Sequence, residues 1–285
     1  ALMDSLHPSR TVIGGDNREA MEKVLGLYAG LDAPHLMCGF ETAELIKYAS
    51  NGFLAAKISY MNEIARLAEA VGADVDTVAQ GMGMDPRIAP KHLKAGIGYG
   101  GSCFPKDVDE LLALARRRHI RLRLLAETKR VNDTQIDWFI GKINAVQPIA
   151  GSRALVLGAA FKENTDDQRE SPGIRLIEKL LRLGAAEVRV LDPTVRSEAD
   201  LRWRRRPGPR LLQRLKVVSE DEGAADGIHF AALATPWDQF RHLPWRAWAS
   251  GAARALLFDG RNFLDPAEMK EAGWSYSGVA REVGR

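Results

Sequence analysis

Apolar side chains recur at helical spacing over most of the first half of the chain. Between Glu41 and Val71 there is no proline and only one glycine, Gly52, and apolar residues fall three or four positions apart. This pattern predicts one long, alanine-rich helix that ends at Gly72 and suits close packing against another helix. Weaker helical patterns cover residues 17–30, 74–80, 105–114 and 122–145.

The second half of the chain alternates short apolar runs with helical patterns. An amphipathic helix is expected at 171–183, with Ser171 as its N-cap and Pro172 in its first position. Alternation of strands and helices predicts a parallel, doubly wound, Rossmann-like sheet. The expected fold class is therefore α/β, an all-helical domain with a long dimerisation helix followed by a doubly wound sheet. The expected strands cover 154–157, 188–191, 216–218, 228–233 and 255–258.

The change in pattern predicts three domains. Residues 11–15 resemble a strand end and a turn, and one strand with one helix is too little for a domain. We therefore interpret 1–34 as the remnant of a preceding domain, here expected to be absent from the chain. A central helical domain at 35–148 and a sheet domain at 149–285 follow, with Pro148 and Gly151 at the boundary.

Composition narrows the class of protein. The 285 residues are 46% hydrophobic, enough for a sizeable core, and the formal net charge of +3 gives no reason to expect nucleic acid or a membrane as partner. No apolar run approaches the roughly 20 residues of a membrane span. The two cysteines, Cys38 and Cys103, form neither a disulfide framework nor a metal cluster and fit a reducing cytoplasm. Cys38 is expected to be a buried apolar residue.

A basic stretch interrupts the second half of the chain. Four arginines fall within residues 202–206 and Arg210 follows, with prolines between them. We interpret the stretch as a solvated loop; a patch that binds phosphate or a partner is the alternative.

The segment from Gly98 to Asp107 carries the strongest chemical signal. Its glycines let the backbone approach a ligand closely, and Pro105 starts a helix directly after Cys103. Unpaired N–H groups and the helix dipole at such a position favour a thiolate, and Lys106 adds positive charge. Cys103 is therefore a candidate nucleophile; a buried structural cysteine beside a helix cap is the alternative.

A second candidate pair lies on the long helix. Lys47 and Asn51 are four residues apart, so their side chains share one helix face. A cationic donor beside an amide donor is a plausible oxyanion site. On a helix alone, such a pair is more often a solvated face.

Together these segments resemble the UDP-glucose and GDP-mannose dehydrogenase family over essentially the whole chain. The resemblance rests on motifs in the order and at the spacing of the family. They are Ala1–Asp4 with Pro8 and Arg10, Glu44–Asn51, Gly98–Asp107, Phe161–Lys162 with 164–166 and Arg169–Pro172, and Phe258–Asn262.

The resemblance implies a role for each matching residue. Cys103 would be the nucleophile, Lys47 and Asn51 would stabilise oxyanions, and Asp107 would help to activate water. Two residues would contact NAD: Arg169 and Lys106. The substrate-binding residues would be Arg87, acting across a dimer, with Lys94, Tyr99, Gly100, Phe161, Lys162 and Arg261. No metal is implied. The alternatives are a surface salt bridge for Arg87, a surface lysine for Lys162, and an ion pair of Arg169 with Glu170 or Asp166.

The implied reaction is an NAD-dependent oxidation of a nucleotide sugar at C6, from alcohol to carboxylate. The motif details favour UDP-glucose as substrate and UDP-glucuronate, a polysaccharide precursor, as product. A homodimer through the long helix is also implied. UDP-N-acetylmannosamine or GDP-mannose as substrate, and a catalytically silent module that binds a nucleotide sugar and dimerises, are the alternatives.

Two elements of the family pattern are missing from the sequence. No G-x-G-x-x-G fingerprint follows a strand, since the alternation at Gly96, Gly98 and Gly100 has no strand before it. The family's catalytic glutamate would precede Ala1. We therefore expect the 285-residue chain, taken alone, not to turn over.

Overall fold

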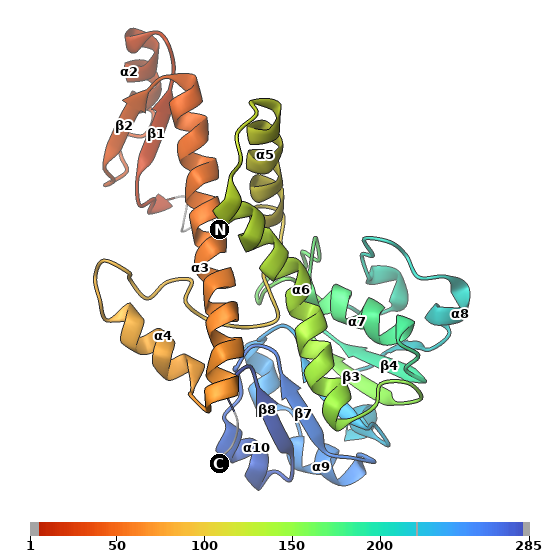
Figure 1. Cartoon of the computed structure of the whole chain (residues 1–285). Helices are drawn as coiled ribbons and strands as arrows, with labels where there is room; N and C mark the ends of the chain where they lie inside the picture. Colours follow the sequence, from red (N-terminus) through yellow and green to blue (C-terminus); the bar gives the residue numbers. More distant parts are fainter. Residues whose placement is uncertain (1–5, 221, 282–285) are drawn as a thin grey trace. The chain divides into compact units, whose positions relative to one another are not determined.

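The computed structural model describes residues 6–220 and 222–281, and Figure 1 shows the course of the chain. The chain divides into two compact units, Ala1–Phe53 and Leu54–Arg285. The motif at Ala1–Asp4, which carries part of the family resemblance, lies outside the described residues. The domain limits expected after residues 34 and 148 remain predictions.

A small α/β motif makes up most of the first unit. Strands β1 (Thr11–Gly14) and β2 (His35–Cys38) pair in parallel over all four residues, and α2 (Arg18–Gly26) connects them. Asn17 caps α2 by accepting a hydrogen bond from a backbone amide. The pattern of the sequence predicted β1 and α2 but missed β2, which is too short to show a period. Cys38 is half-buried at the end of β2, so the expectation of full burial was wrong.

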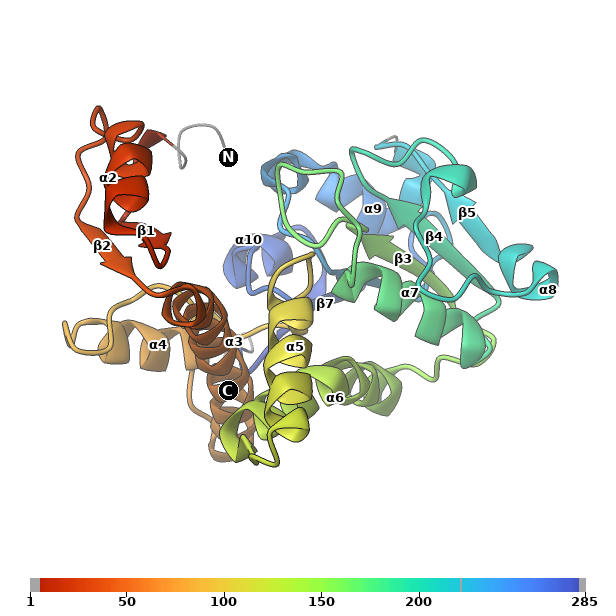
Figure 2. The same ribbon diagram turned by 90° about the horizontal axis from the view of Figure 1, so that it is seen from above.

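Four helices follow as the sequence predicted. The longest, α3 (Phe40–Val71), has 32 residues and ends before Gly72, whose φ of +74° favours glycine. A short turn joins the third and fourth of these helices, α5 (Phe104–Arg117) and α6 (Arg123–Val146), as Figure 2 shows. No helix among the described residues is long and apolar enough to cross a membrane. The other three helices are α4 (Val75–Gly83), α5 (Phe104–Arg117) and α6 (Arg123–Val146).

The second unit contains a six-stranded parallel sheet in the order β5-β4-β3-β6-β7-β8. This confirms the expected doubly wound architecture. Its strands are β3 (Arg153–Leu157), β4 (Glu187–Leu191), β5 (Leu215–Val217), β6 (Phe230–Leu233), β7 (Leu256–Asp259) and β8 (Ser275–Gly278). The sequence analysis missed β8, because Ser-Tyr-Ser-Gly contains no apolar run.

The expected amphipathic helix is α7 (Pro172–Arg182), capped by Ser171. Three short helices were missed, since each is too brief for a helical period: α8 (Pro209–Leu212), α9 (Trp245–Gly251) and α10 (Pro266–Glu271). Short 3-10 segments lie at Glu198–Asp200, Glu222–Ala225 and Asp238–His242.

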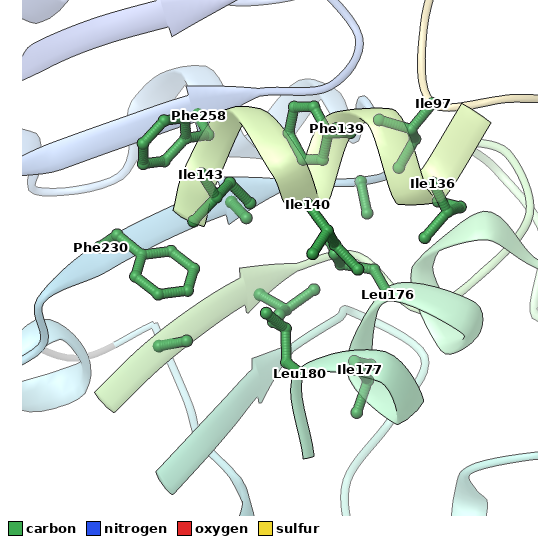
Figure 3. Packing of buried hydrophobic residues seen from close by; sticks show 14 of the residues in the cluster. Ile97, Ile136, Phe139, Ile140, Ile143, Leu176, Ile177, Leu180, Phe230 and Phe258 are labelled. Carbon is green, nitrogen blue, oxygen red and sulfur yellow. The ribbon is translucent and has the colours of Figure 1, made fainter. Parts of the chain in front are cut away.

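Both faces of the sheet are covered, which explains why its strands are apolar throughout. Ala154 and Val156 of β3 belong to the core beneath α6 and α7, whereas Leu155 and Leu157 belong to the core beneath α9 and α10. Full burial of a valine or leucine side chain such as these stabilises the fold by about 1.5–3 kcal/mol. Figure 3 shows the first of these cores, where α6 and α7 meet the sheet. Its labelled side chains include Phe139, Ile140, Ile143, Leu176, Leu180 and Phe230.

The carboxyl ends of the central strands meet at one edge of the sheet. There the Asp192 carboxylate accepts hydrogen bonds from the amides of Ala159 and Ala160, at 2.6 and 3.1 Å, and from the Trp237 indole at 3.1 Å. These bonds hold the loop that leaves β3. Doubly wound sheets bind ligands at such edges.

Candidate active site

A glycine-rich loop leads into Cys103 and α5. A Cβ atom at Gly100 would lie 2.2 Å from the carbonyl oxygen of Glu170, so only glycine fits there without a backbone shift. The next amide, of Gly101, donates a hydrogen bond of 2.9 Å to the carbonyl of Arg169. The loop is therefore pinned against the segment that precedes α7.

Cys103 is the N-cap residue of α5, and its side chain is exposed. Its sulfur lies 3.7 Å from the Ser102 hydroxyl and forms no capping hydrogen bond to the helix. The sulfur therefore lies at the positive end of the α5 helix dipole without a hydrogen bond from the first N–H groups of the helix. This is the position that the sequence predicted for Cys103.

Asp107 lies one turn further along α5 and is fully buried. Its carboxylate pairs with the Lys106 ammonium at 2.9 Å, and the Lys106 side chain remains 57% exposed. The Asp107 amide donates a hydrogen bond of 2.8 Å to the carbonyl of Cys103. A carboxylate and an ammonium group are thus fixed within one helical turn of the sulfur.

Arg169 forms a bidentate ion pair with Asp167. Its Nε donates to Oδ1 at 3.0 Å and its Nη2 donates to Oδ2 at 2.7 Å. This partner is neither Glu170 nor Asp166, the two that the sequence analysis considered. The hydrogen bonds and charge of Asp167 raise the pKa of Arg169, and the Cys103 sulfur contributes a smaller rise. The guanidinium therefore lies within electrostatic reach of the sulfur.

A cavity of about 640 Å³, here called cavity A, lies at the carboxyl ends of β3 and β7. Aromatic rings accompany its charges: the Arg241 guanidinium lies 3.8 Å from the centroid of the Phe263 ring. Such a lining suits an anionic ligand that also carries a flat ring. The cationic side chains of cavity A are Lys94, Lys162, Arg241 and Arg261.

Arg261 connects the sheet to the glycine-rich loop. Its Nε donates to the carbonyl of Ala234 at 2.8 Å, and its Nη1 donates to the carbonyl of Gly98 at 2.9 Å. Burial lowers the pKa of Arg261 to about 10, so the guanidinium stays charged at neutral pH. Its own amide is held by the Asp259 carboxylate at 2.9 Å.

A second cavity of about 360 Å³, cavity B, shares residues with cavity A, including Lys94, Phe161 and Arg261. Its further lining includes Tyr99, Gly100 and Phe104, which follows Cys103 directly. Six predicted substrate-binding residues therefore line two adjoining cavities that lead from the sheet edge toward the cysteine. They are Lys94, Tyr99, Gly100, Phe161, Lys162 and Arg261.

His92 also lines cavity B, and the sequence analysis missed it. Its backbone has a φ of +67°, and its Nδ1 atom is buried without a hydrogen-bond partner among the described residues. Burial lowers the pKa of His92, and the charges of Lys57 and Lys91 lower it further. The imidazole is therefore neutral at neutral pH. Strain and an unsatisfied buried atom typically occur together at ligand sites.

Three buried amide side chains form hydrogen bonds with the backbone of the glycine-rich loop. Asn62 accepts a hydrogen bond from the Gly96 amide at 2.8 Å, and Gln135 donates to the Gly96 carbonyl at 2.8 Å. Asn132 binds both backbone groups of Tyr99, at 2.8 and 3.1 Å. The sequence analysis missed these positioning residues, although polar residues three apart on an otherwise apolar helix face were a usable signal.

A third cavity of about 590 Å³, cavity C, lies on the Lys106 side of the loop. Its basic residues suit the diphosphate of a dinucleotide. Of the basic stretch that we interpreted as a solvated loop, Arg202 and Arg204 belong to this lining. Among the described residues, no group of three His, Cys, Asp or Glu side chains could hold a metal ion. The cationic side chains of cavity C are Lys106, Lys129, Arg169, Arg175, Arg202 and Arg204.

Among the predicted site residues of the second unit, Cys103, Asp107 and Arg87 line none of these three cavities. Lys47 and Asn51 lie one turn apart on the part of α3 that belongs to the first unit, and their convergence with Cys103 remains a prediction. Arg87 follows α4 and is 88% exposed, in an ion pair of 2.6 Å with Asp85. This is the salt bridge weighed as the alternative, while the contact of Arg87 across a dimer remains a prediction.

Two models of one protein family match the chain. The central domain of the UDP-glucose/GDP-mannose dehydrogenase family matches residues 41–134, and its UDP binding domain matches residues 155–266. UDP-glucose 6-dehydrogenase YwqF of Bacillus subtilis is 36% identical over 99% of this chain and 62% of its own length. UDP-glucose 6-dehydrogenase of Pseudomonas aeruginosa is 37% identical, with the same coverage of 99% and 62%.

The solved structures agree with this match. The structure of a UDP-glucose dehydrogenase from the archaeon Pyrobaculum islandicum superposes with a TM-score of 0.84 at 34% identity. The superposed region covers 98% of this chain and 60% of the Pyrobaculum islandicum chain. This chain thus spans less than two thirds of the length of the relatives it matches.

Proposed function

This chain belongs to the UDP-glucose/GDP-mannose dehydrogenase family, and we propose on that premise that it binds UDP-glucose and carries the nucleophile that binds the sugar covalently during its oxidation. The observation that supports this most is the pair of adjoining cavities A and B. Their lining includes the six residues that the resemblance implies for substrate binding, and cavity B also includes Phe104, which follows Cys103.

The chemistry of the two cavities matches a nucleotide sugar. The four cations of cavity A outnumber its two carboxylates and complement a diphosphate, and the Phe161 and Phe263 rings offer surfaces for a nucleobase. Cavity B is lined by Phe104, which follows Cys103 directly, so we assign the hexose to it. Arg261 lines both cavities and would contact the diphosphate at their junction.

The proposed reaction runs through the Cys103 sulfur. The C6 alcohol first loses its hydroxyl proton and a hydride, which gives the aldehyde. The thiolate then adds to this aldehyde and forms a thiohemiacetal, whose oxyanion Lys47 and Asn51 would stabilise. Loss of a hydride turns the thiohemiacetal into a thioester. Water, activated with the help of Asp107, then cleaves the C–S bond, releases the carboxylate and returns the thiolate. The net change at C6 is a loss of four electrons.

NAD, when bound, would supply the acceptor for each of the two hydrides. Arg169 and Lys106 would hold part of it, because both are accessible cations that line cavity C beside the cysteine loop. The 285 residues contain no glycine fingerprint after a strand, so these side chains would provide only part of a dinucleotide site. A polypeptide of these residues alone is therefore expected to bind nucleotide sugar without turnover.

The relatives support UDP-glucose over other nucleotide sugars, since both sequence relatives are named UDP-glucose 6-dehydrogenase. A UDP-D-ManNAc dehydrogenase from Pyrococcus horikoshii shares the fold at 25% identity and a TM-score of 0.79. Homodimerisation through α3 and a cytoplasmic site of action, where Cys103 stays reduced, belong to the same proposal.

Calorimetric titration of the purified chain tests the proposal. UDP-glucose should bind more tightly than UDP-N-acetylmannosamine or GDP-mannose. Lys162→Ala should weaken binding about tenfold, because it removes a charge-assisted contact to phosphate. Lys270→Ala, an exposed lysine on α10, is the matched control and should change nothing. Equal loss in both variants, or no heat of binding with any of the three, contradicts the proposal.

A further inference from the structure

The turn between α5 and α6 concentrates positive charge. We call residues 114–124 the basic turn; the sequence from 111 to 126 contains no acidic residue. Its charge exceeds the formal net charge of +3 for the whole chain, so the remainder of the chain is slightly acidic. No ion pair joins these arginines to another described residue. The five arginines, all exposed, are Arg116, Arg117, Arg118, Arg121 and Arg123.

Helix stability explains only part of this cluster. Arg116 and Arg117 lie in the last turn of α5, where cations interact favourably with the helix dipole. Arg121 and Arg123 flank the N-terminus of α6, where the dipole disfavours cations. The N-cap there is Leu122, which makes no capping hydrogen bond. The basic turn therefore departs from favourable helix design, and such departures typically mark functional sites.

Apolar side chains are exposed among these charges. Leu114 is 43% exposed, Ile120 is 56% exposed and Leu124 is 86% exposed. Leu124 thus leaves most of its apolar surface in water. Burial of this surface against a partner would remove the unfavourable free energy of its hydration. The basic turn combines cations with aliphatic side chains and contains no Phe, Tyr or Trp.

We propose that the basic turn docks on the surface of a bilayer that contains anionic lipid. Arginine side chains bind headgroup phosphates, while aliphatic side chains between them enter the boundary of the acyl region. Nucleic acid is a poorer match, because single-strand binding relies on aromatic stacking. The whole-chain charge gave no reason to expect a membrane partner; the local concentration of charge does. Attachment would be peripheral and independent of the proposed enzymatic function.

Vesicle co-sedimentation of the purified chain tests this proposal. Vesicles of phosphatidylcholine with about 30% phosphatidylglycerol should bind the chain, and pure phosphatidylcholine should not. The variant Arg117→Gln/Arg121→Gln/Arg123→Gln should bind about 100-fold more weakly, at about fivefold per arginine. Leu124→Ser should weaken binding without a change in charge. The matched control is Arg205→Gln/Arg206→Gln/Arg210→Gln, which removes as many charges from another exposed loop.

Three outcomes would overturn the proposal. One is the absence of binding to anionic vesicles at low salt. Another is an equal loss of binding in the control variant, which would indicate a non-specific effect of charge. The third is a change of oligomeric state in the Arg117/Arg121/Arg123 variant, which would make the basic turn a subunit contact. Unchanged UDP-glucose affinity and an unchanged melting temperature establish that the variants are folded.

Discussion

Among single residues, Cys103 combines exposure with the positive end of a helix, whereas Cys38 is half-buried at the end of a strand. Because the thiolate is the reactive form, iodoacetamide should alkylate Cys103 about tenfold faster than Cys38. UDP-glucose should slow the reaction, since cavity B ends at Phe104. Peptide mapping by mass spectrometry measures both rates.

The Cys103→Ser variant provides the corresponding control, because it should retain only the slow label on Cys38. In a complete enzyme the same change should block the thioester step and abolish formation of the carboxylate. An unreactive Cys103, or full double oxidation by the serine variant, would refute the covalent mechanism.

His92 predicts a dependence of stability on pH. Burial, Lys57 and Lys91 lower its pKa, so it stays neutral in the folded chain. As the pH falls through about 6.5, the unfolded chain binds a proton at this position more readily than the folded chain does. The stability of the parent chain relative to His92→Asn should therefore fall as the pH is lowered from about 7 to about 5. Asparagine tolerates the positive φ, so the backbone is preserved.

Urea unfolding across this pH range measures the effect. His119→Asn is the matched control, because His119 also has a positive φ of 56° but is exposed. Two stability curves that run parallel for the parent chain and His92→Asn would contradict the assignment of a neutral, half-buried imidazole.

Among the elements, the glycine-rich loop and α6 each contain a glycine, and replacement by alanine should change the stability of the fold in opposite directions at the two positions. A Cβ at Gly100 meets a carbonyl oxygen at 2.2 Å, whereas a Cβ at Gly141 in α6 meets nothing within 4 Å. Gly100→Ala should destabilise the fold by about 1–3 kcal/mol and weaken UDP-glucose binding. Gly141→Ala should stabilise it by up to about 1 kcal/mol through helix propensity.

Thermal unfolding with and without UDP-glucose distinguishes these two outcomes. If Gly100→Ala matched the parent chain in both measurements, the loop would not be pinned against the Glu170 carbonyl as described.

Element prediction from the sequence succeeded where the local pattern was long. The period of α3 and the apolar runs of β3 and β4 identified these elements to within a few residues. The strand β2 was missed because His-Leu-Met-Cys does not alternate, and β8 was missed because Ser-Tyr-Ser-Gly contains no apolar run. Both become strands by pairing with a neighbouring strand. Packing, not propensity, makes such segments strands.

For the whole molecule, self-association through α3 remains a proposal with a direct test. Tyr60, Leu67 and Val71 are 52%, 60% and 68% exposed and recur at intervals of seven and four residues. A stripe of this kind on a long helix suits a second copy of the same helix. Leu67→Arg should therefore weaken a dimer by at least about tenfold, because it places a charge in the apolar contact.

Sedimentation velocity of the variant against the parent chain measures this change. Leu183→Arg, which alters a 49% exposed leucine after α7, is the matched control and should leave the dimer intact. A monomeric parent chain, or equal dissociation of both variants, would contradict dimerisation through α3.

The sequence by itself determined the order of the elements and the chemical character of the cysteine segment, because both depend on neighbouring residues. Helical period, the Pro105 start of α5 and the position of Cys103 before it are local properties. Tertiary structure alone decided which distant groups support that segment. Asn132 and Arg261 reach the loop from α6 and from the end of β7. A linear sequence does not reveal such contacts, since they arise only when the chain folds back on itself.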